Sequence, residues 1–78
     1  MEQHLSQYKI FYEVARCGNI SRAAKELYIS QPAISKAISK LEESLGIKLF
    51  SRNSRGVQLT REGTILFQHV NTAFDSIG

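Results

Sequence analysis

The sequence predicts a mainly α-helical domain that carries one small β-hairpin and ends in a long helix. Three observations support this prediction. Two helical segments are joined by a turn of three residues, 28–30, and the second segment has both a start and a stop signal. Two short extended runs flank residues 53–56, which are rich in turn-forming side chains. The last segment, residues 61–77, repeats apolar side chains at helical spacing.

The first segment, residues 3–17, is expected to be a helix with two apolar stripes. The larger stripe has five members at helical spacing: Leu5, Tyr8, Phe11, Tyr12 and Ala15. Ile10 and Val14 form a second stripe on a different face of the same helix. A helix with two apolar stripes should contact two neighbours. We expect the second stripe to pack against the last helix.

A short helix, residues 22–27, is expected next, with Ser21 as its cap. Ala23 and Ala24 lie on its inner side, where small side chains let a second helix cross closely. Ile29 is the expected buried side chain of the turn that follows.

The second helix of this pair is expected over residues 31–45. Ser30 can cap it, Pro32 is tolerated in its first turn, and Gly46 suits the conformation that ends a helix. A short helix, a three-residue turn and a capped second helix form the layout of a helix-turn-helix, here residues 20–39. The alternative is a plain helical hairpin in an all-α core.

The faces of the second helix favour the helix-turn-helix. At about 100° per residue, its apolar side chains share one face: Ile34, Ala37, Ile38, Leu41 and Leu45. The opposite face carries Pro32, Ser35, Lys36 and Ser39. This face is small, polar and basic, so it can enter a groove of DNA and form hydrogen bonds at the groove floor.

Residues 47–59 are expected to form a hairpin from two extended runs, 47–52 and 57–59. The side chains that would anchor it on the core are Leu49, Phe50, Val57 and Leu59. Arg52 and Arg55 lie near or at its tip. A basic hairpin beside a helix-turn-helix is a wing, and its Arg side chains can reach phosphates or the minor groove.

The last helix is expected to begin after Thr60 as its cap, with Glu62 near the positive end of the helix dipole. Its apolar side chains fall within an arc of about 120°: Leu66, Phe67, Val70, Ala73, Phe74 and Ile77. This apolar surface is larger than the first helix can cover, and its spacing is heptad-like. We therefore expect these residues to form a dimer contact. The pattern runs up to Gly78, as expected for a piece of a longer protein.

Charge is concentrated in the middle of the chain. Residues 20–61 carry eight Lys or Arg against three Glu, a net charge of +5, whereas the remainder carries a net charge of −2. A basic middle favours a polyanionic partner, although a solvated surface with chance asymmetry is the alternative.

Other functional classes have little support in the sequence. The single cysteine, Cys17, excludes an internal disulfide and a cysteine-based metal cluster. There is no set of nucleophile, base and acid, no phosphate-binding glycine loop, and only two histidines, far apart. We expect no enzyme activity, no cofactor, no membrane span and no signal peptide.

Several linked blocks resemble the N-terminal domain of LysR-type transcriptional regulators. The blocks lie in one register between residues 5 and 63, at residues 21–27, 30–36, 41–46, 49–52 and 59–63. The resemblance implies a winged helix-turn-helix over residues 1–59 and a dimerising linker helix over residues 60–78. It also implies a C-terminal effector-sensing domain that this chain lacks.

The resemblance further implies roles for individual residues. The block at residues 30–36 matches the start of the family's recognition helix, so the expected base readers are Gln31, Pro32, Ser35 and Lys36, with Ser39 as a lesser candidate. The expected contacts to the DNA backbone are Ser21, Arg22, Ser30 and Lys40. Arg52 matches the wing arginine and Arg55 occupies the tip. Lys36 departs from the family, where Arg is frequent, and a Lys makes a point-charge contact where the rigid fork of Arg could be bidentate to guanine.

These inferences predict a bacterial regulator that binds double-stranded DNA at a dyad-symmetric site as a homodimer, with a tetramer possible in the full-length protein. A small-molecule effector is expected only in the missing domain. The expected location is the bacterial cytoplasm, on the nucleoid. The competing reading is a winged-helix module that binds protein, which would share the core and the charge.

Overall fold

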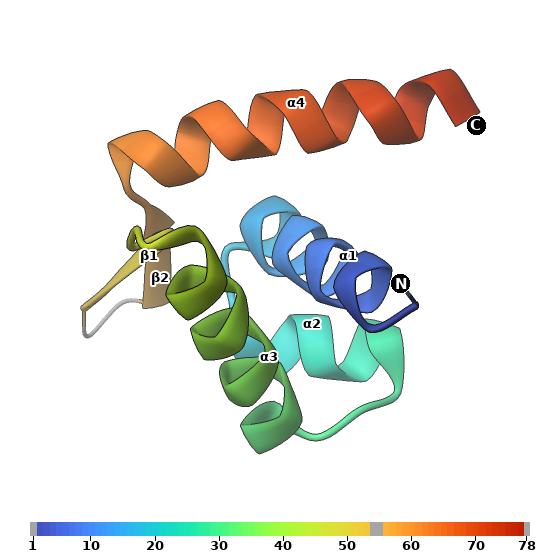
Figure 1. Ribbon diagram of the computed structural model, residues 1–78. Helices are drawn as coiled ribbons and strands as arrows, with labels where there is room; N and C mark the ends of the chain where they lie inside the picture. Colours follow the sequence, from blue (N-terminus) through green and yellow to red (C-terminus); the bar gives the residue numbers. More distant parts are fainter. Residues whose placement is uncertain (1, 54–55, 78) are drawn as a thin grey trace.

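The computed structural model describes residues 2–53 and 56–77, and the surroundings of the side chains in residues 7–53 and 56–73. Its six elements follow in chain order (Figure 1): α1 (Glu2–Cys17), α2 (Ile20–Leu27), α3 (Gln31–Leu45), β1 (Phe50–Asn53), β2 (Gly56–Leu59) and α4 (Arg61–Ile77). The predicted class, a mainly helical domain with one hairpin and a final long helix, is confirmed.

The first three helices and the base of the hairpin enclose the core. Its largest fully buried side chains come from α1, α3 and the segment before β1: Phe11, Val14, Ile34, Leu41 and Leu49. Ala23 and Ala24 of α2 are buried too, which confirms that small side chains line the inner side of this helix. The rings of Phe11 and Phe50 meet with centroids 5.4 Å apart and join the hairpin to α1.

The start of α2 differs from the prediction. The helix begins at Ile20, and its cap is Asn19, whose side-chain oxygen accepts a hydrogen bond from the Arg22 N–H at 3.0 Å. Ser21 therefore lies inside the first turn with an exposed side chain. Both residue types are good caps, but Asn19 lies directly after Gly18, where the chain leaves α1 and takes extended backbone angles.

The boundaries of α3 are those predicted. The Ser30 hydroxyl accepts a hydrogen bond from the Ala33 N–H at 3.3 Å, and Gly46 ends the helix with a φ of 71°. Ile34, Ile38 and Leu41 are buried. Leu45, expected on the buried face, is 39% exposed because it lies in the last turn, beyond the core.

The hairpin is shorter than predicted. Its strands pair antiparallel, with Phe50 opposite Leu59 and Asn53 opposite Gly56. The first strand begins at Phe50 and not at Ile47, because the Ile47 N–H still bonds to the carbonyl of Glu42 at the end of α3. The predicted tip residue Arg55 lies outside the described residues.

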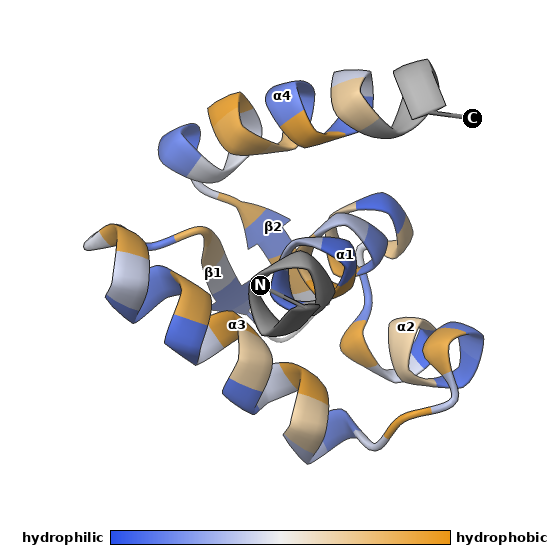
Figure 2. Cartoon of the chain, turned by 45° about the vertical axis from the view of Figure 1, so that its right-hand side comes forward, coloured by the Kyte–Doolittle hydropathy of each residue, from blue (hydrophilic) through white to orange (hydrophobic). Residues whose placement is uncertain are grey.

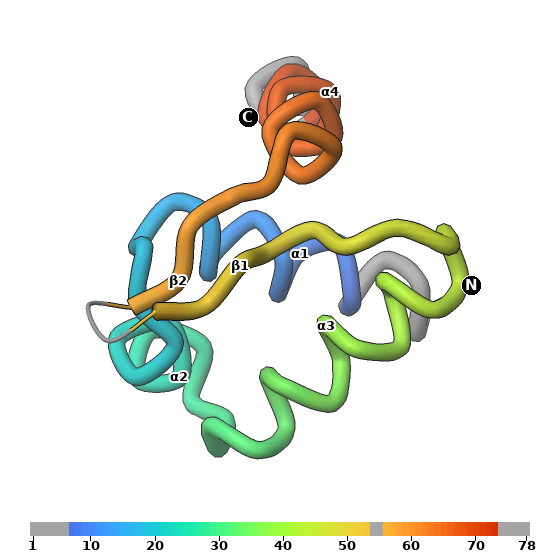
Figure 3. The backbone as a smooth tube through the Cα atoms, turned by 90° about the vertical axis from the view of Figure 1, so that its left-hand side faces the viewer, coloured from blue at the N-terminus to red at the C-terminus, as the bar shows by residue number. Residues whose placement is uncertain are grey.

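Helix α4 begins as predicted, with the Thr60 hydroxyl accepting a hydrogen bond from the Gly63 N–H at 3.0 Å. It packs on α1 through Tyr12, whose ring stacks on Phe67 and whose hydroxyl donates to Asn71 Oδ1 at 3.1 Å. Tyr12 belongs to the larger predicted stripe, and the contact of the second stripe, Ile10 and Val14, with α4 stays a prediction. Figures 1 and 3 show α4 on the opposite side of the molecule from the α2–α3 turn.

Candidate nucleic-acid interface

The outward side of α3 is a narrow polar surface. Four of the predicted base readers, Gln31, Pro32, Lys36 and Ser39, are exposed, and Ser35 is half-buried. Figure 2 shows hydrophilic and hydrophobic positions alternating along α3, as expected for a helix that buries one side only. The structure therefore brings the five predicted readers together on one helix with their polar groups accessible.

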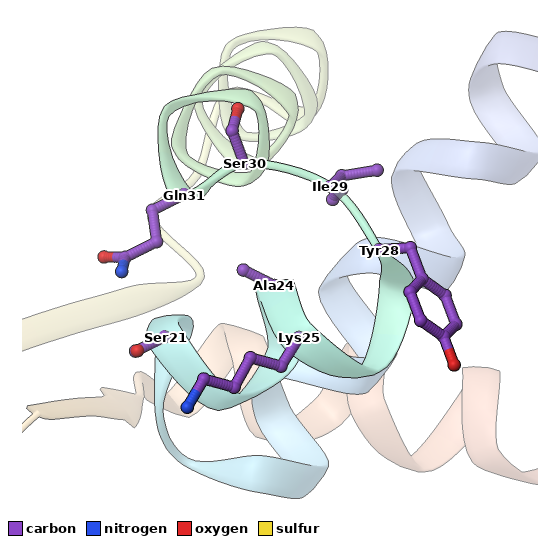
Figure 4. A pocket seen from close by; sticks show the side chains of 7 residues that line it. All are labelled: Ser21, Ala24, Lys25, Tyr28, Ile29, Ser30 and Gln31. Carbon is purple, nitrogen blue, oxygen red and sulfur yellow. The ribbon is translucent and has the colours of Figure 1, made fainter.

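A hollow lies between α2 and the start of α3 (Figure 4). Its lining residues are Ser21, Ala24, Lys25, Tyr28, Ile29, Ser30 and Gln31. In this view Ser21, Lys25 and Gln31 extend to the same side of the turn, whereas the Tyr28 ring points away from them. The half-buried Ile29 packs against the core. Lys25 was not among the predicted site residues, although its position one helical turn after Ser21 places both side chains on the same face of α2.

A second hollow separates α3 from the wing. Its lining residues are Ile38, Ser39, Glu42, Lys48, Phe50 and Arg52. Arg52, the predicted wing residue, is exposed on β1. Lys48 was not among the predicted site residues, because only the fold shows that the segment before β1 runs beside Ser39.

The basic side chains of this region are not neutralised by acidic neighbours. Among the side chains that the structure describes, the single ion pair joins Arg16 to Glu13 on α1, 2.9 Å apart, and this hydrogen bond raises the pKa of Arg16. Six exposed cations around α2, α3 and the wing have no ion pair with another described side chain: Arg22, Lys25, Lys36, Lys40, Lys48 and Arg52. The interface is therefore basic and open to an anionic partner.

The predicted dimer residues on α4 differ in how far they are buried within the protomer. Val70 is buried, and Leu66 and Phe67 are half-buried against the protomer's own core. Ala73 is exposed. The side-chain surroundings of Phe74 and Ile77 lie outside the described part of the chain.

The described part of the chain holds neither a membrane-spanning helix nor a cluster of metal ligands. Within residues 2–53 and 56–77, no helix is long and apolar enough to span a bilayer. In the same part of the chain, no three His, Cys, Asp or Glu side chains are grouped closely enough to hold a metal ion.

Comparison with known proteins decides the family. A family model described as bacterial regulatory helix-turn-helix protein, lysR family, matches residues 5–64. This chain belongs to the LysR family. Its LysR-type relatives include the regulator ClcR of Pseudomonas putida, 48% identical over 62 residues, which are 80% of this chain and 21% of ClcR. The regulator CbbR of Rhodospirillum rubrum is 43% identical over 75 residues, 96% of this chain and 25% of CbbR.

Solved structures support the same assignment to the LysR family. The DNA-binding domain of CbnR in complex with DNA matches with a TM-score of 0.85 and 37% identity, over 100% of this chain and 87% of that one. The BenM DNA-binding domain in complex with catB site 1 DNA matches with a TM-score of 0.88 and 36% identity, over 94% and 81% of the two chains. The chain spans about a quarter or less of the length of the curated relatives it matches. The predicted family and winged helix-turn-helix fold are confirmed.

Proposed function

We propose that this LysR-family chain binds a dyad-symmetric site on double-stranded DNA as a dimer, with α3 in the major groove and the wing at or near the minor groove. Its function class, sequence-specific DNA binding by a transcriptional regulator, follows from the family. The observation that carries the proposal is the exposed polar side of α3, which holds Gln31 and Lys36 above the buried Ile34 and Ile38.

The first half of α3 supplies chemistry that matches base edges. Gln31 can pair with the N6 and N7 atoms of adenine, and Lys36 can donate to the O6 and N7 atoms of guanine. Pro32 and the Cβ of Ser35 present apolar surface to a thymine methyl group. Ser39, one turn further along α3, is a lesser candidate for a base contact.

The backbone contacts would fix the register of α3 in the groove. Ser21, Arg22 and Ser30 lie near the starts of α2 and α3, where hydroxyl groups, a guanidinium and helix-start N–H groups favour a phosphate. Lys40 lies further along α3 and is exposed. The wing would add Arg52, and Arg55 at its tip remains part of the proposal.

The wider context of the protein is also proposed. Helix α4 would join two copies, so that two recognition helices read the two halves of the site. A C-terminal domain would hold the small-molecule effector, and the full-length protein could assemble into a tetramer. We propose that it acts on the nucleoid in the bacterial cytoplasm.

Selection from a random pool of duplexes tests this function. We expect one dyad-symmetric motif to be enriched. The chain should bind the selected duplex at least about a thousandfold more tightly than a random duplex. Gel shifts at two salt concentrations should show affinity falling as salt rises, because cations such as Lys36 displace counterions from DNA. A chain that enriches no motif and binds no duplex would instead be a protein-binding winged-helix module.

A further inference from the structure

The connection between α3 and β1 is organised by one residue, Glu42. Its backbone carbonyl accepts hydrogen bonds from the N–H groups of Gly46 at 2.8 Å and Ile47 at 3.2 Å. Its side-chain oxygen Oε2 accepts from the N–H groups of Leu49 at 2.8 Å and Phe50 at 3.3 Å. One residue of α3 thus accepts from four of the five N–H groups between Gly46 and Phe50, and backbone donors left without partners are costly.

These bonds fix where the wing begins. Leu49 is fully buried and Phe50 is 9% exposed, so the core holds the apolar side of this segment while the Glu42 carboxylate holds its N–H groups. Phe50 and Arg52 are two residues apart in β1 and therefore point to the same face of the strand. The direction of Arg52 is consequently set by how Phe50 is attached to α3.

The wing face that carries Arg52 looks across a hollow at the outer side of α3. Ser39 and Glu42 line this hollow from the helix, Lys48 lines it from the segment before β1, and Arg52 lines it from β1. The Glu42 carboxylate makes no ion pair with Lys48 or Arg52; it is engaged by backbone N–H groups instead. Both cations therefore remain available to an outside anion.

We infer that Glu42 is a positioning residue for DNA binding. It fixes the distance between the recognition helix and the wing, and so places Lys48 and Arg52 on the phosphate backbone when α3 lies in the major groove. This inference rests on the proposed function. Positioning and charge predict opposite effects of Glu42 on DNA affinity. A carboxylate beside DNA repels the phosphates, so a charge effect alone predicts tighter binding when Glu42 is neutralised.

Two substitutions separate positioning from charge. Glu42→Gln removes the charge but keeps an acceptor oxygen at the same reach, whereas Glu42→Asp keeps the charge and is one methylene too short for Leu49 and Phe50. We expect Glu42→Gln to bind the duplex selected from the random pool within a few-fold of the wild type. We expect Glu42→Asp to bind it about tenfold more weakly. The matched control is Glu43→Gln, an exposed neighbour that should leave this affinity unchanged or slightly higher.

A double-mutant cycle with Arg52→Ala tests whether Glu42 acts through the wing. Arg52→Ala should weaken binding by about tenfold in the wild-type background and reduce the salt slope by about one charge. In the Glu42→Asp background the same change should have little further effect, because Arg52 is already displaced. Circular dichroism and thermal unfolding of each full chain check that binding is compared between folded proteins.

The outcomes separate the two proposals. Wild-type affinity in Glu42→Asp would overturn the inference, as would an equal effect of Arg52→Ala in both backgrounds. In either case the wild type would still prefer its selected duplex and the proposed function would stand. If the wild type shows no preference among duplexes, the proposed function itself fails.

Discussion

At the residue scale, Tyr28 has a backbone conformation that tyrosine rarely adopts. It ends α2 with a φ of 58° and a ψ of 39°, in the left-handed region. Tyr28 is 94% exposed, so packing within the protomer does not compensate for this conformation. A side chain other than glycine in this region costs roughly 1–2 kcal/mol. The α2–α3 turn is thus formed at a local cost that the surrounding helices offset.

Replacing Tyr28 with glycine should stabilise the free chain. We expect Tyr28→Gly to raise the free energy of unfolding by about 0.5–1 kcal/mol, because relief of the left-handed strain exceeds the extra entropy of glycine in the unfolded state. The unfolding midpoint should rise by a few degrees, measured by circular dichroism without DNA. Tyr28→Ala keeps a Cβ and should give no such increase. An equal gain from alanine would show that the exposed ring, and not the backbone, is responsible.

Residues with local roles could be predicted from the sequence, and residues with distant partners could not. The caps at Ser30 and Gly46 depend on neighbours within one helical turn. The choice of Asn19 over Ser21 depends on where the chain leaves α1, which two equally good capping residues do not reveal. The roles of Glu42 and Lys48 depend on the segment before β1 lying beside α3. Their residue types alone therefore did not predict these roles.

At the element scale, a glycine allows the start of α4 to pack closely against the rest of the domain. Gly63 is buried, and a Cβ added to it would collide with the carbonyl oxygen of Leu49 and lie 3.1 Å from a methyl carbon of Leu59. The Leu49 carbonyl also accepts a hydrogen bond from the Thr60 N–H at 3.0 Å. The start of α4 therefore lies directly against the segment that leads into the wing.

Gly63→Ala should destabilise the fold despite the better helix propensity of alanine. We expect a loss of about 1–3 kcal/mol in the free energy of unfolding, because the Leu49 carbonyl is backbone and cannot rotate away. Denaturant unfolding measures this loss. Gln68→Ala introduces an alanine at an exposed position of the same helix and should be close to neutral. If Gly63→Ala were as stable as the wild type, the start of α4 would not lie this close to the Leu49 carbonyl.

The elements themselves were largely readable from the sequence. Helical periodicity and turn residues predicted four helices and one hairpin in the observed order. The strand boundary at Ile47 was wrong because the bonds of Ile47 and Leu49 to Glu42 replace strand pairing there. The partner of Tyr12 was missed because spacing shows which residues share a face, but not which helix covers that face.

At the scale of the whole molecule, the proposed DNA surface and the proposed dimer surface lie on opposite sides (Figures 1 and 3). The first part of the apolar stripe on α4 faces the protomer's own core, where Val70 is buried and Phe67 stacks on Tyr12 of α1. Ala73, one turn further along this stripe, is exposed. We therefore propose that Ala73 lies in the contact with the partner protomer.

A charge at Ala73 should disrupt the dimer. We expect the wild-type chain to sediment as a dimer at high concentration and Ala73→Glu to sediment as a monomer, because the new carboxylate would be buried without a partner. Gln68→Glu adds the same charge on the other side of α4 and should remain dimeric. A wild-type chain that stays monomeric at high concentration, with and without DNA, would refute the dimer for this chain.

The central claim is that the first half of α3 reads bases, and the base preference of Gln31→Ala tests it most directly. Gln31 is uncharged, so its removal leaves the attraction to phosphates unchanged. Selection from the same random pool should give a motif that loses its preference at one base pair in each half-site and keeps the remainder. A motif identical to that of the wild type, with affinity lowered equally for every duplex, would contradict the claim.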